Sequence, residues 1–247
     1  PKVFYRYPIE RKSHSQNITN WLGLTKNPHL FLYLLLLLMK PFFVIASLRR
    51  LLEASWLFTW TEFIALLQVI LIHGTQKRKY TYEPYWFHLY DVSMIIKQRG
   101  YPVEMVVAAL YHDSAEDPCF TLPDRFGYLK GIISGLPALD HELVLDLVSD
   151  LTDVYVYQHF PHLNRKDRKL LEIKRFSSAS LQAKIIKLAD LYNNTVCIHK
   201  QDPGFYRVYY PECNQLLECI GNVDPVIFHQ VRHSLIPPPE VLVPVEG

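Results

Sequence analysis

The stretch Tyr-His-Asp-Ser-Ala-Glu-Asp-Pro at residues 111–118 is the part of the sequence that best indicates both the fold and the position of a site. It follows an apolar run from Val103 to Leu110, which predicts a buried helix that ends in ionisable side chains. Such side chains are costly to bury unless they are paired or bind a metal. We therefore expect His112 and Asp113 to lie at the centre of a site.

Two further residues are candidates for the same site. His88 lies on an apolar helix predicted over residues 85–98, and Asp190 lies on another predicted over residues 179–197. Two imidazoles and two carboxylates from three helices make a mixed nitrogen and oxygen site for a divalent metal. The alternatives are a core histidine at position 88, and a helix cap or an internal salt bridge at position 190.

Glu116 and Asp117 are candidates for proton transfer. If the helix continues past the His-Asp pair, His112 and Glu116 are four residues apart, as are Asp113 and Asp117, so these groups share a surface. A metal lowers the pKa of a bound water, and an adjacent carboxylate can take its proton. The alternative is a solvated acidic end of the helix.

The composition fits a folded protein rather than a disordered one. The chain has 247 residues, of which 49% are hydrophobic and 20% charged, so it can bury a substantial core. A net charge of +2 gives no general signature of nucleic-acid binding. Its four cysteines are scattered without a C-x-x-C, which fits neither a zinc ribbon nor a disulfide framework. A reducing cytoplasm is the simplest location.

The N-terminal region is open to three interpretations. Residues 30–39 form an apolar run, which is short of the roughly 20 residues of a membrane-spanning helix. Residues 29–48 reach that length but contain a lysine and a proline near the middle, so membrane association is an alternative that we do not favour. An extra packed helix is the second interpretation. The third is that Met39, the first methionine, starts the native protein and residues 1–38 are not translated.

The remainder of the chain predicts an all-α fold. It shows helical periodicity, without an internal repeat or the alternation typical of strands. The segment at 202–212, with two prolines and three tyrosines, is not predicted to be helical, and residues 121–136 look loosely organised. We expect an apolar N-terminal extension over residues 1–45, one domain over residues 46–235 and a proline-rich tail over residues 236–247. Further helices are predicted from Leu48 to His73 and over residues 140–150, 164–175 and 225–234.

Four segments, in order, resemble motifs of the HD superfamily of metal-dependent phosphohydrolases. Residues 73–88 are similar to "H-x-G-Q-x-R-K-x-G-E-P-Y-x-x-H" and residues 108–117 to "A-A-L-L-H-D-x-x-E-D". Residues 151–153 are similar to "L-T-D" and residues 186–194 to "K-L-A-D-x-x-x-N". The match covers roughly residues 60–200. It is most similar to the hydrolase domain of RelA/SpoT-type proteins and to single-domain small alarmone hydrolases.

The resemblance implies an HD-domain helical bundle with a metal site between its helices. By matching position, one manganese ion per chain would be bound, with other divalent metals as alternatives. Glu116 and Asp117 match the catalytic acidic pair of the family. The implied metal ligands are His88, His112, Asp113 and Asp190.

The implied activity is removal of the 3′-pyrophosphate from guanosine tetra- or pentaphosphate, the alarmones of the stringent response. Arg78 matches an arginine that packs on the guanine base, and its neighbours Lys77 and Lys79 would assist with phosphates. Lys187 and Asn194 match positions that line the nucleotide pocket.

The chain also departs from the family pattern. Tyr82 stands where the family usually has glycine, and Pro118 replaces a threonine. These departures alter the surroundings of the base, so an HD phosphohydrolase acting on another nucleotide or phosphoester is an alternative. A non-catalytic nucleotide-binding or membrane-tethered regulatory module is another. The basic segment 164–168 resembles a helix of some related proteins and could contact phosphates, or could be a solvated face.

Overall fold

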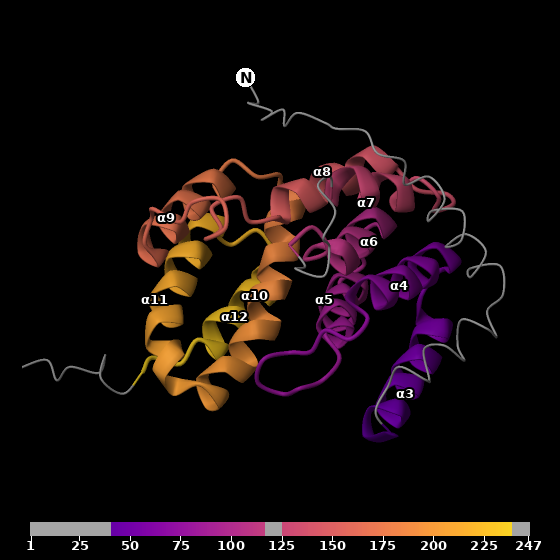
Figure 1. Ribbon diagram of the computed structural model, residues 1–247, viewed down its shortest axis with the longest axis horizontal. Coiled ribbons are helices and arrows are strands. Elements are labelled where there is room, and N and C mark those ends of the chain that lie inside the picture. Colours follow the sequence, from indigo (N-terminus) through magenta and orange to yellow (C-terminus); the bar gives the residue numbers. More distant parts are fainter. Residues whose placement is uncertain (1–40, 117–124, 239–247) are drawn as a thin grey trace, which may run out of the picture. The chain divides into compact units, whose positions relative to one another are not determined.

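The computed structural model of the protein describes residues 41–116 and 125–238, and this part of the chain is built from helices (Figure 1). The predicted all-α fold is confirmed, because no strand forms among these residues and an isolated bridge between Lys77 and Pro84 is the sole β-type pairing there. The ten helices are α3 (Pro41–Leu57), α4 (Trp60–His73), α5 (Trp86–Gln98), α6 (Val103–Tyr111), α7 (Arg125–Ile133), α8 (His141–Leu151), α9 (Arg165–Phe176), α10 (Leu181–Gln201), α11 (Pro203–Ile220) and α12 (Pro225–Ser234).

The core lies around α6 and α10. Every residue from Met105 to Tyr111 is buried, because a helix that is apolar on all sides has to be enclosed. Helix α6 packs against α4, α5 and α8, while α10 packs against α5, α8, α11 and α12. This packing brings α5, the C-terminal end of α6 and the middle of α10 together, and these are the elements that carry the predicted metal ligands.

The predicted helix from Leu48 to His73 is two helices in the structure. Helix α3 ends at Leu57, and α4 begins at Trp60 after a break. Thr59 caps α4 with its hydroxyl while Glu62 accepts a hydrogen bond from the Thr59 backbone N–H, which is a complete capping box. The threonine and glutamate at this spacing were a readable start signal, but the continuous apolar pattern hid it.

The helix that carries the His-Asp pair is shorter than predicted. It ends at Tyr111, and a turn follows in which the Glu116 N–H donates to the Asp113 carbonyl at 2.9 Å. The prediction that His112 and Glu116 share a helical face is therefore wrong. A turn suits the site better, because it lets the side chains of consecutive residues point in different directions.

Two helices fall where none was predicted. Helix α11 contains both prolines of the 202–212 segment: Pro203 stands in its first turn, where no N–H is needed, and Pro211 lies inside it. The Asp202 carboxylate caps it by accepting from the Phe205 N–H at 2.9 Å. Helix α7 lies inside the stretch that looked loosely organised. Helices α5, α8, α9, α10 and α12 fall within a few residues of their predicted bounds.

Several predictions concern residues outside the described ones. These are the predictions for residues 1–40, for Asp117 and Pro118, and for the tail from residue 239 onward. The chain divides into two compact units at residues 49 and 50, and the second unit carries all the predicted site residues. Among the helices that the structure describes, none combines the length and the hydropathy needed to cross a membrane.

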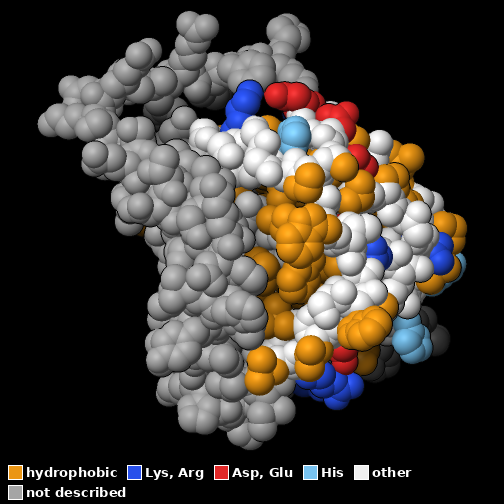
Figure 2. Space-filling view, turned by 90° about the vertical axis from the view of Figure 1, so that its right-hand side faces the viewer, with side chains coloured by type: hydrophobic (Ala, Val, Ile, Leu, Met, Phe, Trp, Pro, Cys, Tyr) orange, Lys and Arg blue, Asp and Glu red, His pale blue; other side chains and the backbone are white. Residues whose placement is uncertain are grey.

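One face of the molecule is rich in exposed hydrophobic side chains (Figure 2). In the second unit, the large exposed hydrophobic residues of α3 and α4 are Leu52, Trp56, Leu57 and Trp60. Trp56 is the most open of them, with 87% of its surface accessible. The core side of the same helices is formed by other residues, among them Leu51, Ala54 and Leu66.

The loop that precedes α5 contains a strained residue. Tyr82 has a φ of 58°, a left-handed conformation that costs a residue with a Cβ roughly 1–2 kcal/mol. Its N–H donates to the Arg78 carbonyl at 3.1 Å, which closes the turn, and its side chain is exposed. The backbone thus explains why glycine would suit a position that holds tyrosine in this chain.

We predict that Tyr82→Gly is more stable than Tyr82→Ala by about 1 kcal/mol, because only glycine adopts this conformation without strain. Both variants lose the exposed ring, so their difference isolates the Cβ. Urea unfolding monitored by circular dichroism would measure it. Equal stability of the two variants would contradict a strained turn at this position.

Candidate metal centre

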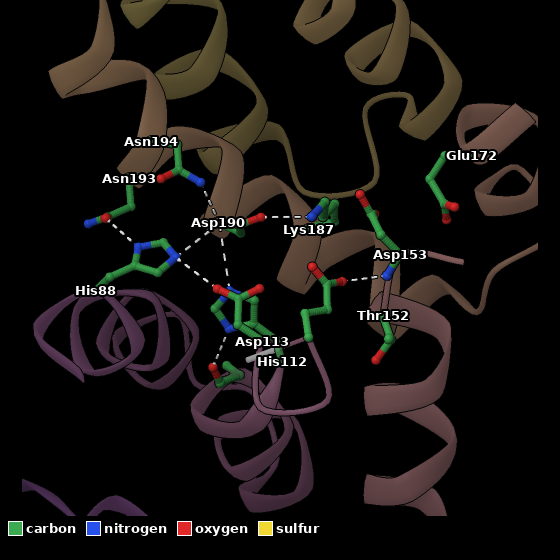
Figure 3. A network of polar contacts seen from close by, with 12 residues as sticks. His88, His112, Asp113, Thr152, Asp153, Glu172, Lys187, Asp190, Asn193 and Asn194 are labelled. Atoms are coloured by element: carbon green, nitrogen blue, oxygen red, sulfur yellow. Dashed lines mark hydrogen bonds and ion pairs between the residues drawn. The ribbon is translucent and has the colours of Figure 1, made fainter. Parts of the chain in front are cut away.

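Two imidazoles and two carboxylates meet between α5, α6 and α10 (Figure 3). The ligand atoms of His88, His112 and Asp190 all lie within 4.8 Å of one another, and these three residues are buried. Asp113 completes the group, with its Oδ2 3.1 Å from His112 Nε2 and 3.7 Å from His88 Nε2. The structure therefore brings together all four residues that were predicted as ligands.

The spacing of these atoms suits one shared cation. Asp190 Oδ1 lies 3.2 Å from His88 Nε2 and 3.7 Å from His112 Nε2, so nitrogens and oxygens alternate around the group. Ligands placed about 2.1 Å from a metal are separated by about 3.0–3.4 Å at octahedral or tetrahedral angles. The group is already close to that size, and His88, His112 and Asp190 could hold a metal ion.

Each imidazole forms a hydrogen bond through Nδ1, so its Nε2 faces the centre as the nitrogen that a metal would bind. His112 Nδ1 donates to the Ala109 carbonyl at 2.7 Å, and His88 Nδ1 donates to the amide oxygen of Asn193 at the same distance. A neutral histidine that donates through Nδ1 keeps its lone pair on Nε2, as metal-binding histidines do. The buried Nε2 of His112 has no hydrogen-bonding partner within the described residues, which is the observation expected of a metal ligand.

The two carboxylates are held by other side chains. The Tyr85 hydroxyl donates to Asp113 Oδ2 at 2.6 Å. Asn194 donates to Asp190 Oδ1 at 2.7 Å, and the Lys187 ammonium donates to Asp190 Oδ2 at 2.9 Å. Each oxygen that faces the centre is thus fixed before any ligand arrives, and a metal would not have to order the site.

The electrostatics also favour a cation. Burial would raise the pKa of Asp190, but Lys187 and the two histidines hold that pKa well below its usual range. Burial would lower the pKa of His112, but Asp113 and Asp190 raise it well above its usual range. In both cases the carboxylates demand positive charge nearby, because uncompensated buried charges are very costly.

Glu116 lies beside this group with the opposite tendency. Burial, together with the charges of Asp153 and Asp113, raises its pKa to about 8. Its Oε1 accepts a hydrogen bond from the Asp153 N–H, which holds the carboxyl toward the 151–153 segment. A carboxyl that titrates near neutral pH can both take and give a proton, which is what acid-base catalysis requires.

A cavity of about 240 Å³ opens beside the metal centre. It reaches the centre through Asp113 and Asp190, and charged residues of both signs line much of it. The volume is slightly below that of typical small-molecule sites, so it suits one end of a ligand rather than a whole nucleotide. The other lining residues are Tyr85, Leu151, Asp153, Arg165, Lys169, Glu172, Ile173, Phe176, Lys187, Leu191, Asn194, Tyr209, Glu212, Cys213 and Leu216.

The residues predicted to bind substrate are placed differently from one another. Lys187 and Asn194 line the cavity and contact Asp190. Arg78 donates to the amide oxygens of Asn193 and Asn194, both at 2.8 Å, so it supports the residues that orient the metal centre. Lys79 is 73% exposed outside the cavity lining, with its Nζ 3.6 Å from Asp202. Lys77 lies in the same loop, where its backbone pairs with Pro84.

Sequence reasoning missed the residues that orient the ligands. Tyr85 and Asn193 lie within two of the quoted motifs, but hydrogen bonds across the fold cannot be predicted from spacing. Arg165 was considered only as part of the basic segment 164–168, and Lys169 was not considered, although both line the cavity. The signal that was available is their spacing of four residues, which puts both on one face of α9.

The comparisons with known proteins agree with this geometry. The chain is 32% identical over 125 residues to the guanosine-3′,5′-bis(diphosphate) 3′-pyrophosphohydrolase MESH1 of Drosophila melanogaster, a match that covers 49% of this chain and 60% of that protein. It is 43% identical over 58 residues to the guanosine-3′,5′-bis(diphosphate) 3′-pyrophosphohydrolase of Aquifex aeolicus, a match that covers 22% of this chain and 8% of that protein. The chain thus spans less than two thirds of the length of these curated relatives. No family model matches.

A solved structure shows the same fold. It is described as a metazoan ortholog of SpoT that hydrolyzes ppGpp and plays a role in starvation responses. The superposition has a TM-score of 0.58 at 22% identity and covers 71% of this chain and 94% of the other. The chain therefore has the all-α HD-type fold. The predicted resemblance to guanosine-3′,5′-bis(diphosphate) 3′-pyrophosphohydrolases is likewise confirmed.

We predict that Asn193→Ala weakens metal binding by about 10–100-fold, the usual effect of removing a residue that orients a metal-binding histidine. His88 would lose the acceptor that fixes its Nδ1 proton. Titration calorimetry with Mn²⁺ would measure the change. The matched control is Asn214→Ala on α11, which removes a hydrogen bond to the Tyr210 carbonyl. Equal affinity in both variants would contradict the orienting role.

Proposed function

We propose that the protein is a metal-dependent phosphohydrolase that removes the 3′-pyrophosphate from guanosine tetra- or pentaphosphate. The observation that carries this proposal is the alternating group of two histidines and two aspartates beside a charged cavity. The names of the two curated relatives support the choice of substrate. As a small-molecule enzyme it needs no nucleic-acid partner, and we propose a cytoplasmic location.

We propose manganese as the metal, one ion per chain, held by His88, His112, Asp113 and Asp190. Imidazole and carboxylate ligands suit several first-row divalent ions, so other metals are alternatives. When bound, such an ion polarises a phosphoryl oxygen and lowers the pKa of a coordinated water. The residues around it then supply orientation and proton transfer.

Glu116 is our candidate for proton transfer. Its raised pKa, about 8, matches the requirement for a group that accepts a proton from water near neutral pH. Asp117, the second predicted catalytic acid, remains a proposal from the motif alone. Lys187 lines the cavity beside Asp190, where its ammonium would neutralise charge that develops on a phosphoryl group.

The remaining substrate contacts stay proposals from the resemblance. Arg78 would contact the guanine base, and Lys77, Lys79 and Asn194 would assist at the phosphates and sugar. A second candidate function keeps the metal centre but acts on another nucleotide or phosphoester. The strained Tyr82, in the loop that carries Arg78, favours this alternative, because it changes the surface offered to a base.

The direct test is a release assay with metal analysis of the same protein. Purified protein incubated with Mn²⁺ and guanosine 3′,5′-bis(diphosphate) is expected to release pyrophosphate. Asp113→Ala should lose bound metal and activity together, since it removes one of the four ligands. A variant that turned over normally without metal would sink the proposal. Activity on simple phosphoesters but not on the tetraphosphate would favour the second candidate.

For Glu116→Gln we expect normal metal content and hydrolysis slowed by about 10²–10⁴-fold, the usual contribution of a general base. Metal content by mass spectrometry and single-turnover rates would measure the two effects. The amide keeps the hydrogen-bond acceptor for the Asp153 N–H, so the fold should not change.

The same variant gives a pH control in metal-free protein. Because the pKa of Glu116 is raised in the folded state, folded protein holds a proton that unfolded protein releases between about pH 4.5 and 8. The stability of the wild type should therefore fall, relative to Glu116→Gln, as the pH rises through this window. Parallel stability curves would show that Glu116 is not perturbed.

A further inference from the structure

The cavity contains three cationic side chains, and each is paired with a carboxylate. Lys187 bonds Asp190, and Lys169 bonds Asp153 at 2.7 Å. Arg165, which opens α9, bonds Glu212 of α11. The exposure of the three cations rises from 20% at Lys187 through 37% at Lys169 to 44% at Arg165. They therefore form a series that leads from the metal centre toward solvent.

The outermost pair differs from the other two in geometry. Arg165 Nε and a terminal guanidinium nitrogen donate to the two oxygens of Glu212 at 2.9 and 2.8 Å. This bidentate arrangement is the one with which arginine also binds a phosphate. The guanidinium lies 5.1 Å from the centre of the Phe205 ring, within the range of a cation–π interaction. The donors of Arg165 are thus arranged to bind an oxyanion, and the Glu212 carboxylate is the oxyanion that they bind in this structure.

Glu212 also differs from Asp190 and Asp153 in the contacts that it makes. Asp190 belongs to the metal centre, and Asp153 carries the N–H that holds Glu116. Within the described part of the chain, the Glu212 carboxylate accepts hydrogen bonds from Arg165 alone. Its side chain is 17% exposed, so solvent can receive the carboxylate if it leaves.

We propose that Glu212 is a specificity-determining residue that competes with a second phosphate group of the substrate for Arg165. This inference rests on the proposed function, in which one phosphate group lies at the metal centre. A substrate with a second phosphate group that enters the same cavity gains Arg165 but must displace Glu212. A substrate without that phosphate leaves the pair intact. The pair thus sets how strongly the site prefers a bis-phosphorylated nucleotide.

Charge decides the direction of the effect. Carboxylate and phosphate compete for the same fork of donors, and the phosphate brings the larger negative charge. Removing the charge of Glu212 removes the competitor while Arg165 stays over Phe205. A neutral glutamine should therefore strengthen binding of the distal phosphate, although it weakens the contact between α9 and α11.

The test compares guanosine 3′,5′-bis(diphosphate) with guanosine 3′-diphosphate on Mn²⁺-loaded protein. Glu212→Gln should lower the Kd for the bis(diphosphate) about tenfold, the gain expected from one additional charge-assisted contact. Its Kd for the 3′-diphosphate should stay within about twofold, since that ligand does not reach Arg165. Arg165→Met should weaken binding of the bis(diphosphate) alone. Titration calorimetry gives the affinities of the wild type and both variants for the two nucleotides, and kcat/KM is measured beside them.

Glu218→Gln is the matched control, because Glu218 is an exposed glutamate on the same helix. The inference is overturned if Glu212→Gln leaves both affinities unchanged, or if it strengthens both equally. It is also overturned if neither nucleotide binds to any form of the protein. Selective tightening without pyrophosphate release in the wild type would support the role of Glu212 and sink the proposed hydrolysis.

Discussion

The structure depends on the burial of the carboxylates of Asp113 and Asp190 against the imidazoles of His88 and His112, which each donate a hydrogen bond through Nδ1. Asp113 and Asp190 face the Nε2 atoms of these imidazoles, while the Nδ1 protons are donated to Ala109 and Asn193. Lys187 balances the charge of Asp190, and the two carboxylates raise the pKa of His112, because buried carboxylates require positive charge nearby. A divalent cation would meet the same requirement, and His88, His112 and Asp190 could hold one.

The fold serves this requirement through the ends of its helices. Helix α6 is buried from Met105 to its end at Tyr111, so that His112 and Asp113 emerge from the core in a turn. Helix α10 lies across α5, α8 and α6, and it brings Asp190, Asn193 and Asn194 over that turn. The charged residues therefore sit on a rigid apolar frame, which is what a preorganised site needs.

How far the sequence predicts this protein is clearest at particular residues. The four ligand candidates could be predicted, because histidine and aspartate on apolar helices need a metal or a polar partner and their motifs occur in order. The break at Thr59 was missed because a continuous apolar pattern hid the capping box, and α11 was missed because its two prolines are tolerated in the packed helix. Tyr85, Asn193 and Glu212 could not be predicted, since each acts through a partner on a distant helix. Spacing along a chain predicts which residues are neighbours on one element, but it does not predict hydrogen bonds between distant elements.

The fork of Arg78 on Asn193 and Asn194 has one further consequence. Those asparagines hold His88 and Asp190, so the loop over residues 75–85 and the metal centre share a single chain of hydrogen bonds. Two sites joined in this way are thermodynamically linked, and the coupling is the same in both directions. Binding of an ion at the metal centre would order the loop. A ligand that binds the Arg78 guanidinium would, in turn, change the affinity of the centre for the ion.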